Sequence, residues 1–186
     1  MIPERFTKAK YEDAPEVIRK AFEKMSETKK GIYIHGPVGS GKTHIAYALK
    51  KQYDRETRYE GDKCFVGRSI RFWNTTELLR EMRKDFDREA YEKRNIAEDL
   101  YEGLLILDDL GSEKMTEWVE ETFYLIVNKR YENIVPTIFT SNFAVKDLSK
   151  RVGDRTASRI VEMCELIELV GADIRTKNIK QSIAKL

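Results

Sequence analysis

Short runs of apolar residues alternate along the chain with longer segments in which apolar residues recur at helical spacing. Short apolar runs bounded by glycine or polar residues are typical of strands buried on both faces of a parallel sheet. Five segments predict strands: 31–35, 69–73, 104–107, 136–140 and 166–170. Because the strands alternate with helices, the sequence predicts an α/β fold with helices on both faces of a parallel sheet.

The segments of helical spacing predict the covering helices. They span 15–24, 43–53, 75–94, 117–131 and 154–163. The helix over 75–94 is highly charged and is expected to break near Asp87. In two of the helices, the positions expected to face the core are Ile45, Ala46, Ala48, Leu49, Trp118, Val119, Phe123, Ile126 and Val127. Residues 1–12 are expected to form an irregular arm, and 54–63 a polar loop.

The length of 186 residues suits a single domain. We divide it into an arm and short helix over 1–30, a core over 31–170 and a basic tail over 171–186. The hydrophobic fraction of 41% predicts a folded globule. Charged residues reach 35%, but their signs nearly cancel to +2, so the total charge does not predict a nucleic-acid partner.

The cysteines and the lack of long apolar runs indicate the cellular compartment of the protein. Cys64 and Cys164 lack the spacing of metal ligands, which favours two reduced thiols. No apolar run approaches the roughly 20 residues of a membrane span. The N-terminal segment lacks the apolar region of a signal peptide. We therefore expect a cytoplasmic protein with no membrane partner.

The strongest chemical signal follows the first predicted strand. Residues 36–43 read Gly-Pro-Val-Gly-Ser-Gly-Lys-Thr, a full match to the P-loop pattern GxxxxGK[ST], and they open a predicted helix. Glycines let backbone N–H groups surround phosphate oxygens, and the helix N-terminus adds a positive field. Lys42 is expected to reach the β- and γ-phosphates of ATP, and Thr43 to bind Mg²⁺. The expected nucleotide contacts are Gly36, Pro37, Val38, Gly39, Ser40, Gly41, Lys42, Thr43 and His44.

Polar residues also end two other predicted strands. Residues 104–109 read Leu-Leu-Ile-Leu-Asp-Asp, the Walker B pattern of an apolar strand ending in acid. Asp108 is expected to hold Mg²⁺, directly or through water, and Asp109 to orient or deprotonate the attacking water. Asn142, in the sequence Thr-Ser-Asn, would contact the γ-phosphate or that water. The alternative is that these residues only cap elements and form turns.

Two arginines form a further candidate. Arg155 and Arg159 are four residues apart and therefore share one helical face. An arginine that reaches across a subunit boundary can stabilise the charge of a transition state. The alternative is a solvated face on which Arg159 pairs with Glu162.

In this order the motifs resemble those of the AAA+ ATPases, specifically the DnaC/DnaI-type helicase loaders and the related IstB-type transposition helpers. The resemblance covers nearly the whole chain: 2–6 resembles the opening segment of that family, 36–43 its Walker A, 104–111 its Walker B, 136–142 its sensor 1 strand, 153–160 its box VII and 171–175 its closing motif. It places the arginine finger on Arg159, with Arg155 as second choice, and implies a sensor 2-like role for Arg175.

The resemblance also implies a fold, an activity and partners. The fold would be an ASCE-type P-loop NTPase, a three-layer sandwich whose five-stranded parallel sheet has the sensor strand between the Walker A and Walker B strands. The activity would be slow, switch-like ATP hydrolysis. The chain would form a homo-oligomer through ATP-bridged interfaces, assemble on single-stranded DNA and bind the replicative DNA helicase.

Two features depart from the family pattern. Loaders usually carry an N-terminal helicase-binding region, whereas only residues 1–30 precede the Walker A strand here. The chain is therefore either an excised core or a naturally short protein, such as one borne by a phage or plasmid. Asp109 replaces the glutamate of many AAA+ proteins, and its shorter side chain fits a switch better than a motor.

The DNA site is weakly marked. Arg80, Arg83, Lys84 and Arg94 of the charged helix would meet DNA phosphates. Acidic residues interleave with them: Glu81, Asp85, Asp87 and Glu89. The alternative is therefore a solvated helix with ion pairs between neighbouring turns. The basic tail would also touch phosphates, or else fray as a terminus.

These observations favour the ATPase core of a helicase loader. One alternative is a transposition helper that uses the same ATPase on double-stranded DNA. Another is a P-loop kinase for a small molecule, although the box VII resemblance argues against it. The last is a nucleotide-gated binding module without useful turnover.

Overall fold

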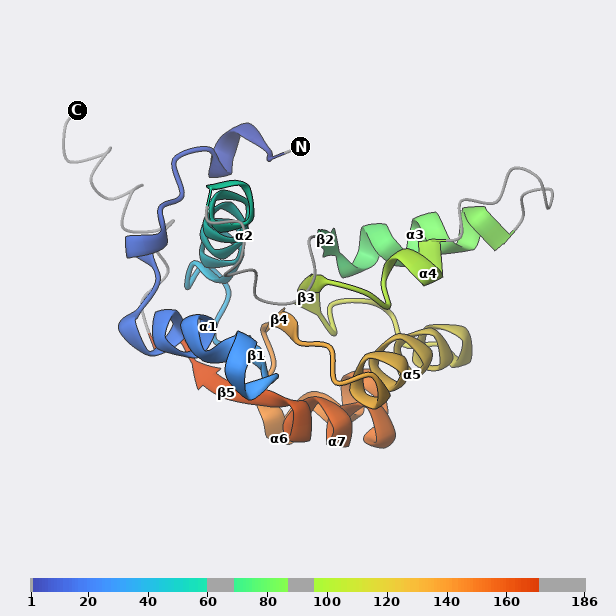
Figure 1. Cartoon of the computed structure of the whole chain (residues 1–186). Helices are drawn as coiled ribbons and strands as arrows, with labels where there is room; N and C mark the ends of the chain where they lie inside the picture. The colour runs from blue at the N-terminus through green and yellow to red at the C-terminus, as the bar shows by residue number, and fades with distance from the viewer. Residues whose placement is uncertain (1, 60–68, 87–95, 171–186) are drawn as a thin grey trace, which may run out of the picture.

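The computed structural model describes residues 2–59, 69–86 and 96–170 (Figure 1). The strands in these ranges are β1 (Gly31–His35), β2 (Ile70–Asn74), β3 (Leu104–Leu110), β4 (Thr137–Ser141) and β5 (Cys164–Glu168). The α-helices are α1 (Glu16–Thr28), α2 (Lys42–Tyr59), α3 (Thr75–Phe86), α4 (Ile96–Asp99), α5 (Glu117–Glu132), α6 (Val145–Val152) and α7 (Asp154–Met163). Two 3₁₀ turns, η1 (Glu4–Phe6) and η2 (Tyr11–Asp13), precede them.

The five strands form one parallel sheet in the order β2-β3-β4-β1-β5. Strand β4 lies between β1 and β3, so the predicted sensor strand is flanked by the Walker A and Walker B strands. Figure 1 shows α1 and α2 on one side of the sheet and α5, α6 and α7 on the other. The predicted three-layer α/β fold with a five-stranded parallel sheet is confirmed.

Alternate residues of the central strands supply the two halves of the core. Leu105 and Leu107 of β3 pack with residues of α5, α6 and α7, whereas Leu104 and Ile106 pack with residues of α1 and α2. This alternation follows from the two-residue period of a strand. The helical positions predicted to face the core are buried, except that Trp118 is only partly buried.

The boundaries correct several predictions. Residues 54–59 are helical, not a loop, because α2 continues to Tyr59. Side-chain pairs one turn apart, Lys50 with Asp54 and Gln52 with Glu56, support this polar end of the helix. Helices α4 and α6 were not predicted, and β5 begins two residues before its predicted start. Helix α3 ends at Phe86, and residues 87–94 of the longer predicted helix lie outside the described ranges.

The N-terminal arm is more ordered than predicted, because it packs on α2. The ring of Phe6 stacks on Tyr47 at 4.7 Å between centroids, and Tyr47 stacks on Phe72 of β2 at 4.1 Å. The Lys51 ammonium group donates hydrogen bonds to the carbonyl oxygens of Thr7 and Ala9. The arm is thereby fixed to the helix that begins with the P-loop lysine.

Arg130 of α5 is completely buried near the amino ends of β3 and β4. Its Nε donates to the Thr137 hydroxyl at 2.6 Å. Its Nη atoms donate to the carbonyl oxygens of Leu100, Gly103 and Pro136 at 2.5–2.8 Å. Burial lowers the pKa of Arg130 to about 9, so the group is still a cation at neutral pH. One guanidinium therefore joins α5 to the starts of two neighbouring strands.

Cys164 is a free, buried thiol whose pKa is raised by burial, and Cys64 lies outside the described ranges. Among the described helices, none combines the length and the apolar character needed to cross a membrane.

Candidate nucleotide site

The predicted nucleotide residues meet at one edge of the sheet. The P-loop leaves the carboxyl end of β1, the two aspartates lie on β3, and Asn142 follows β4. These three strands are neighbours in the order β3-β4-β1, so their carboxyl ends lie side by side. In parallel α/β sheets, ligands bind outside the carboxyl ends of the strands.

The P-loop joins β1 to α2 in a conformation that requires glycine. Gly39 and Gly41 have φ values of 80° and 94°, in the left-handed region that other residues rarely adopt. Helix α2 begins immediately afterwards at Lys42, so its first backbone N–H groups face the loop. The turn and the helix start together form the kind of anion site that phosphate requires.

Lys42 lies inside the loop rather than in solvent, with only 7% of its surface exposed. Its Nζ donates hydrogen bonds of 2.8 Å to the carbonyl oxygens of Gly36 and Pro37 and approaches the Ser40 hydroxyl at 3.4 Å. The ammonium group is therefore held at the centre of the predicted phosphate site.

Asp108 joins the Walker A and Walker B segments. It is 4% exposed, and its two oxygens accept hydrogen bonds from the Thr43 hydroxyl at 3.0 Å and the Thr140 hydroxyl at 2.6 Å. Burial raises the pKa of Asp108, while the two hydroxyl donors oppose that rise. A bound cation would favour the ionised carboxylate further.

This donor set fits Mg²⁺. Within the described ranges there is no group of three or more histidine, cysteine or acidic side chains that would enclose a metal. Mg²⁺ commonly takes one or two protein oxygens and completes its shell with phosphate and water. The hydroxyl of Thr43 and the carboxylate of Asp108 supply such a pair.

Asp109 has a left-handed backbone, with φ of 64°, which is uncommon for a residue with a side chain. Hydrogen bonds hold it there: its N–H donates to the Thr140 hydroxyl at 2.9 Å, and its carbonyl oxygen accepts from the hydroxyls of Thr75 at 3.0 Å and Ser112 at 2.9 Å. The Asn142 amide donates to Asp109 Oδ1 at 2.9 Å. Strained backbones maintained by surrounding contacts cluster at functional sites.

Sequence reasoning missed three residues around the aspartates. Thr140 lies on the same side of its strand as Asn142, because side chains alternate, and this was a usable signal. Thr75 comes from the neighbouring β2–α3 junction, for which the sequence gives no cue. Glu113 accepts a hydrogen bond from the Gly111 N–H at 3.0 Å, and burial, with a smaller effect from Asp109, raises its pKa.

Other predicted residues lie elsewhere. His44 Nε2 lies 2.7 Å from the Asp13 carboxylate of the arm. Arg159 of α7 contacts the rings of Tyr124 and Tyr131 on α5, and within the described ranges none of its hydrogen bonds or ring contacts involves the predicted nucleotide residues. The alternative pairing of Arg159 with Glu162 is not found, since the two form no ion pair in the described structure.

The three predicted DNA-binding residues on α3 have different surroundings. Arg80 is exposed, Arg83 lies over the Trp118 ring at 4.6 Å, and Lys84 pairs with Glu81 at 2.7 Å. The Lys84 pair matches the alternative of a solvated helix. Arg94, Arg175 and the basic tail lie outside the described ranges, so their roles stay predictions.

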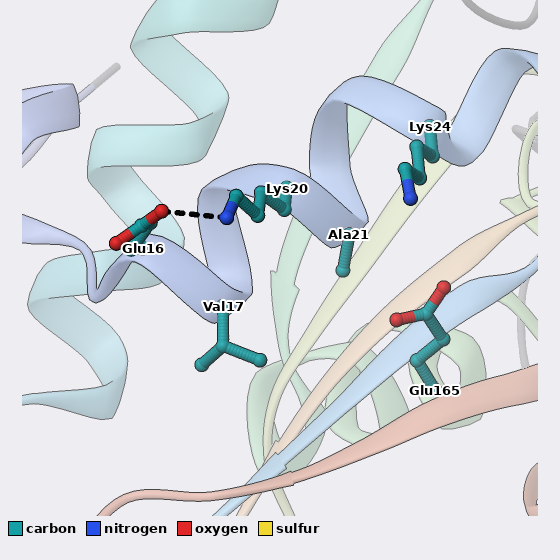
Figure 2. A pocket seen from close by; sticks show the side chains of 6 residues that line it. All are labelled: Glu16, Val17, Lys20, Ala21, Lys24 and Glu165. Carbon is teal, nitrogen blue, oxygen red and sulfur yellow. Dashed lines mark ion pairs between the residues drawn. The ribbon is translucent and has the colours of Figure 1, made fainter.

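A separate open pocket of about 380 Å³ lies between α1 and β5. Figure 2 shows Val17, Ala21 and Lys24 along α1, with Glu165 of β5 opposite and Glu16 paired with Lys20 at 2.6 Å. None of the predicted nucleotide residues lines this pocket.

Comparisons with known proteins agree with this geometry. The family described as IstB-like ATP binding protein matches residues 5–182. The chain is 29% identical over 153 residues to the replicative helicase loader DnaI of Bacillus subtilis, covering 78% of this chain and 45% of DnaI. It is 26% identical over 162 residues to an insertion sequence IS21 protein of Pseudomonas aeruginosa described as ATP-binding, covering 84% and 56% respectively. The chain thus spans about half the length of these two relatives.

A solved structure matches more completely. The crystal structure of the DnaC helicase loader superposes with a TM-score of 0.73 and 27% identity, covering 90% of this chain and all of that one.

Proposed function

The chain belongs to the IstB-like ATP-binding protein family, and from this premise we propose that it is a slow, switch-like ATPase that forms the core of a replicative helicase loader. The observation that carries the ATPase proposal is the joining of Thr43, Asp108 and Asp109 by hydroxyl hydrogen bonds at the carboxyl edge of the sheet. This arrangement supports a role for Thr43 and Asp108 in binding the metal, beside Asp109 as the carboxylate that orients water.

ATP would bind across the P-loop. Lys42 would exchange its carbonyl partners for the β- and γ-phosphates, and the first N–H groups of α2 would donate to phosphate oxygens. Thr43 and Asp108 would hold Mg²⁺, which neutralises phosphate charge when bound. These roles are supported by the burial of Lys42 and by the 3.0 Å contact between Thr43 and Asp108.

Hydrolysis would depend on Asp109 and Asn142. The Asn142 amide occupies Oδ1 of Asp109, and in the described structure Oδ2 has no hydrogen-bond partner. Oδ2 would accept a hydrogen bond, and then a proton, from the attacking water as its oxygen bonds to the γ-phosphorus and the bond to the β–γ bridging oxygen breaks. Asn142 would keep the carboxylate in the correct orientation.

The subunit arrangement follows from Arg159. Because this arginine faces α5 and not the P-loop of its own protomer, we propose that it completes the site of a neighbouring copy in an ATP-bridged homo-oligomer. Single-stranded DNA would bind along α3, where Arg80 is exposed.

The named relatives support two different partners. The similarity to DnaI and to the solved chain of the DnaC helicase loader supports a replicative helicase. The family description and the IS21 relative support a transposase, so a transposition helper is the second candidate. Nothing in these comparisons favours a small-molecule kinase.

Affinity capture from host lysate in the presence of ATP and Mg²⁺ tests the choice. A recovered replicative helicase, absent from a parallel capture with Lys42→Ala protein, is the expected result. Recovery of a transposase instead would overturn the loader proposal. Phosphate release with and without DNA, measured on the same preparation, distinguishes an ATPase from a binding module without turnover.

A further inference from the structure

We propose that Tyr124 and Tyr131 of α5 are positioning residues for Arg159, and that their rings hold its guanidinium ready for a phosphate bound in a second copy of this chain. The inference rests on the proposed function, in which Arg159 acts in trans. It adds a surface feature that the motifs do not contain, an aromatic cradle made of these two tyrosines.

The cradle is formed where α5 and α7 pack together (Figure 1). The Arg159 Cζ atom lies 4.9 Å from the centroid of the Tyr124 ring and 5.7 Å from that of Tyr131. Both distances are within the range of cation–π attraction. The two tyrosines are seven residues apart, so they lie on one face of α5, two turns from each other.

The cradle holds the charge without neutralising it. Arg159 has no carboxylate partner among the described residues. Glu162, one turn further along α7, instead accepts a hydrogen bond from the Tyr131 hydroxyl at 2.7 Å. A carboxylate would compete with an incoming phosphate for the guanidinium, whereas the face of a ring attracts the cation and leaves its charge intact.

The guanidinium also retains unused donors. It has five N–H groups. Its hydrogen bonds are two long ones, from Nη1 to the Arg155 carbonyl oxygen at 3.3 Å and from Nη2 to the Tyr124 hydroxyl at 3.5 Å. Nε is buried and has no hydrogen-bond partner. Because Nε is buried, a phosphate would bind the remaining N–H groups of the two Nη atoms, in the bidentate geometry that arginine favours.

The rings would therefore act by pre-organisation. A long arginine side chain free in solvent samples many rotamers, and only some of them point toward a neighbouring subunit. Contact with two rings narrows that set before the subunits meet. Because the correct geometry is already formed, less of the barrier has to be overcome at the moment of reaction.

The test assigns each change to one side of a mixed interface. Lys42→Ala protein lacks a working P-loop but keeps Arg159, and Arg159→Ala protein keeps its P-loop. Mixing the two should restore part of the ATPase activity. Tyr124→Leu is then added either to the Lys42→Ala chain, which donates the arginine, or to the Arg159→Ala chain, which binds the ATP.

On the donating side we expect Tyr124→Leu to lower the recovered kcat by roughly tenfold, with the KM for ATP unchanged. On the ATP-binding side it should change neither constant. Tyr124→Phe, the matched control that keeps the ring, should retain most of the activity on both sides. Equal losses on both sides, or no loss on the donating side, would overturn the cradle.

Failure of the proposed function gives a different result. If the parent mixture recovers no activity although the chains co-assemble, the trans role of Arg159 is wrong, and the cradle is overturned with it. Recovery in the parent mixture that is insensitive to Tyr124→Leu rejects the cradle alone. Should the leucine chain prove unstable, Tyr124→Met is mixed in the same way, with the same expectations.

Discussion

The two edges of the parallel sheet each contain a buried charge, and they handle it differently. At the amino edge, Arg130 is fully buried and its nitrogens make hydrogen bonds to four neutral oxygens. At the carboxyl edge, Asp108 is buried and, among the described residues, accepts hydrogen bonds from two hydroxyls, those of Thr43 and Thr140. Neither charge forms an ion pair with another described residue.

The difference lies in unused bonding capacity. A carboxylate offers about four lone-pair positions, so Asp108 retains room for a ligand, whereas each guanidinium nitrogen of Arg130 already has a partner in the chain. Folding alone thus satisfies the hydrogen-bonding groups of Arg130 at the amino edge. At the carboxyl edge, Asp108 keeps capacity to bind the metal that accompanies a nucleotide. Changes at the first edge should affect stability, and changes at the second should affect ligand binding and catalysis.

Removing the charge at the amino edge should have the largest effect. Arg130→Met leaves buried carbonyl oxygens without donors and should lower the free energy of unfolding by about 3–5 kcal/mol. Denaturant unfolding measures this loss. ATP affinity, measured well below the melting temperature, should stay within a few-fold of the parent protein. A large loss of affinity in a folded variant would contradict the separation of the two edges.

Lys42→Ala should have the opposite pattern. Without the ammonium group, ATP binding or turnover should fall by about 100-fold or more, while unfolding without nucleotide changes little. Titration with a fluorescent ATP analogue and a phosphate-release assay provide the measurements. If affinity and hydrolysis both stay at the parent values, the P-loop assignment is wrong.

Within the carboxyl edge, the two aspartates should respond differently. Asp108→Asn should weaken the dependence of activity on Mg²⁺. Asp109→Asn should spare ATP binding and slow hydrolysis by about 10- to 100-fold, because a general base typically contributes at least that much. Magnesium titrations of both variants separate the roles. Equal losses of ATP binding in the two would reject the division.

The ionised Asp108 carboxylate should also lower the stability of the protein when no ligand is bound. Its folded pKa is raised above 3.8 by burial, so the folded state holds the proton more tightly than the unfolded chain does. Stability should therefore fall as pH rises from about 4 through the folded pKa. Asp108→Asn should remove this decline and raise the melting temperature at pH 7, because the neutral amide carries no buried charge. A lower melting temperature at pH 7 would show that the carboxylate is not a net cost.

The smallest effect is expected on α3. Neutralising Arg80, Arg83 and Lys84 should weaken single-strand binding and reduce its salt dependence, by about one unit of slope for each phosphate contact. Because Arg83 rests on Trp118 and Lys84 pairs with Glu81, most of the change should come from Arg80. Lys20→Gln is the matched control, since Lys20 forms a similar exposed pair with Glu16. Equal slopes for variant and parent would favour a solvated helix.

The sequence could predict the parts of the site that are local in the chain. The P-loop and the Walker B strand are continuous segments whose residue order reflects their chemistry, and the family match and the sheet order confirm the resemblance and fold drawn from them. Residues 54–59 were assigned wrongly because a polar segment has the same composition in a loop and in the exposed end of a helix. Contacts that depend on neighbouring strands, such as those of Thr75 with the carbonyl oxygens of Asp108 and Asp109, leave no local pattern.

Arg130 illustrates the same limit in the core. In the sequence it is one of many charged residues on a helix that ends in polar residues, and nothing marks it as buried. Its burial becomes clear only in the folded structure. There the amino ends of β3 and β4 lie beside α5, and backbone carbonyl oxygens surround the guanidinium.

The Thr140 hydroxyl has a consequence for the symmetry of the two aspartates. A hydroxyl carries a single proton, which Thr140 gives to the Asp108 carboxylate, while its oxygen receives the N–H of Asp109. The direction of that one proton gives two identical, adjacent side chains different partners: the Asp108 carboxylate accepts the hydroxyl proton, whereas the Asp109 carboxylate accepts the amide of Asn142. Thr140→Val would remove both bonds of this hydroxyl at once without changing either acid.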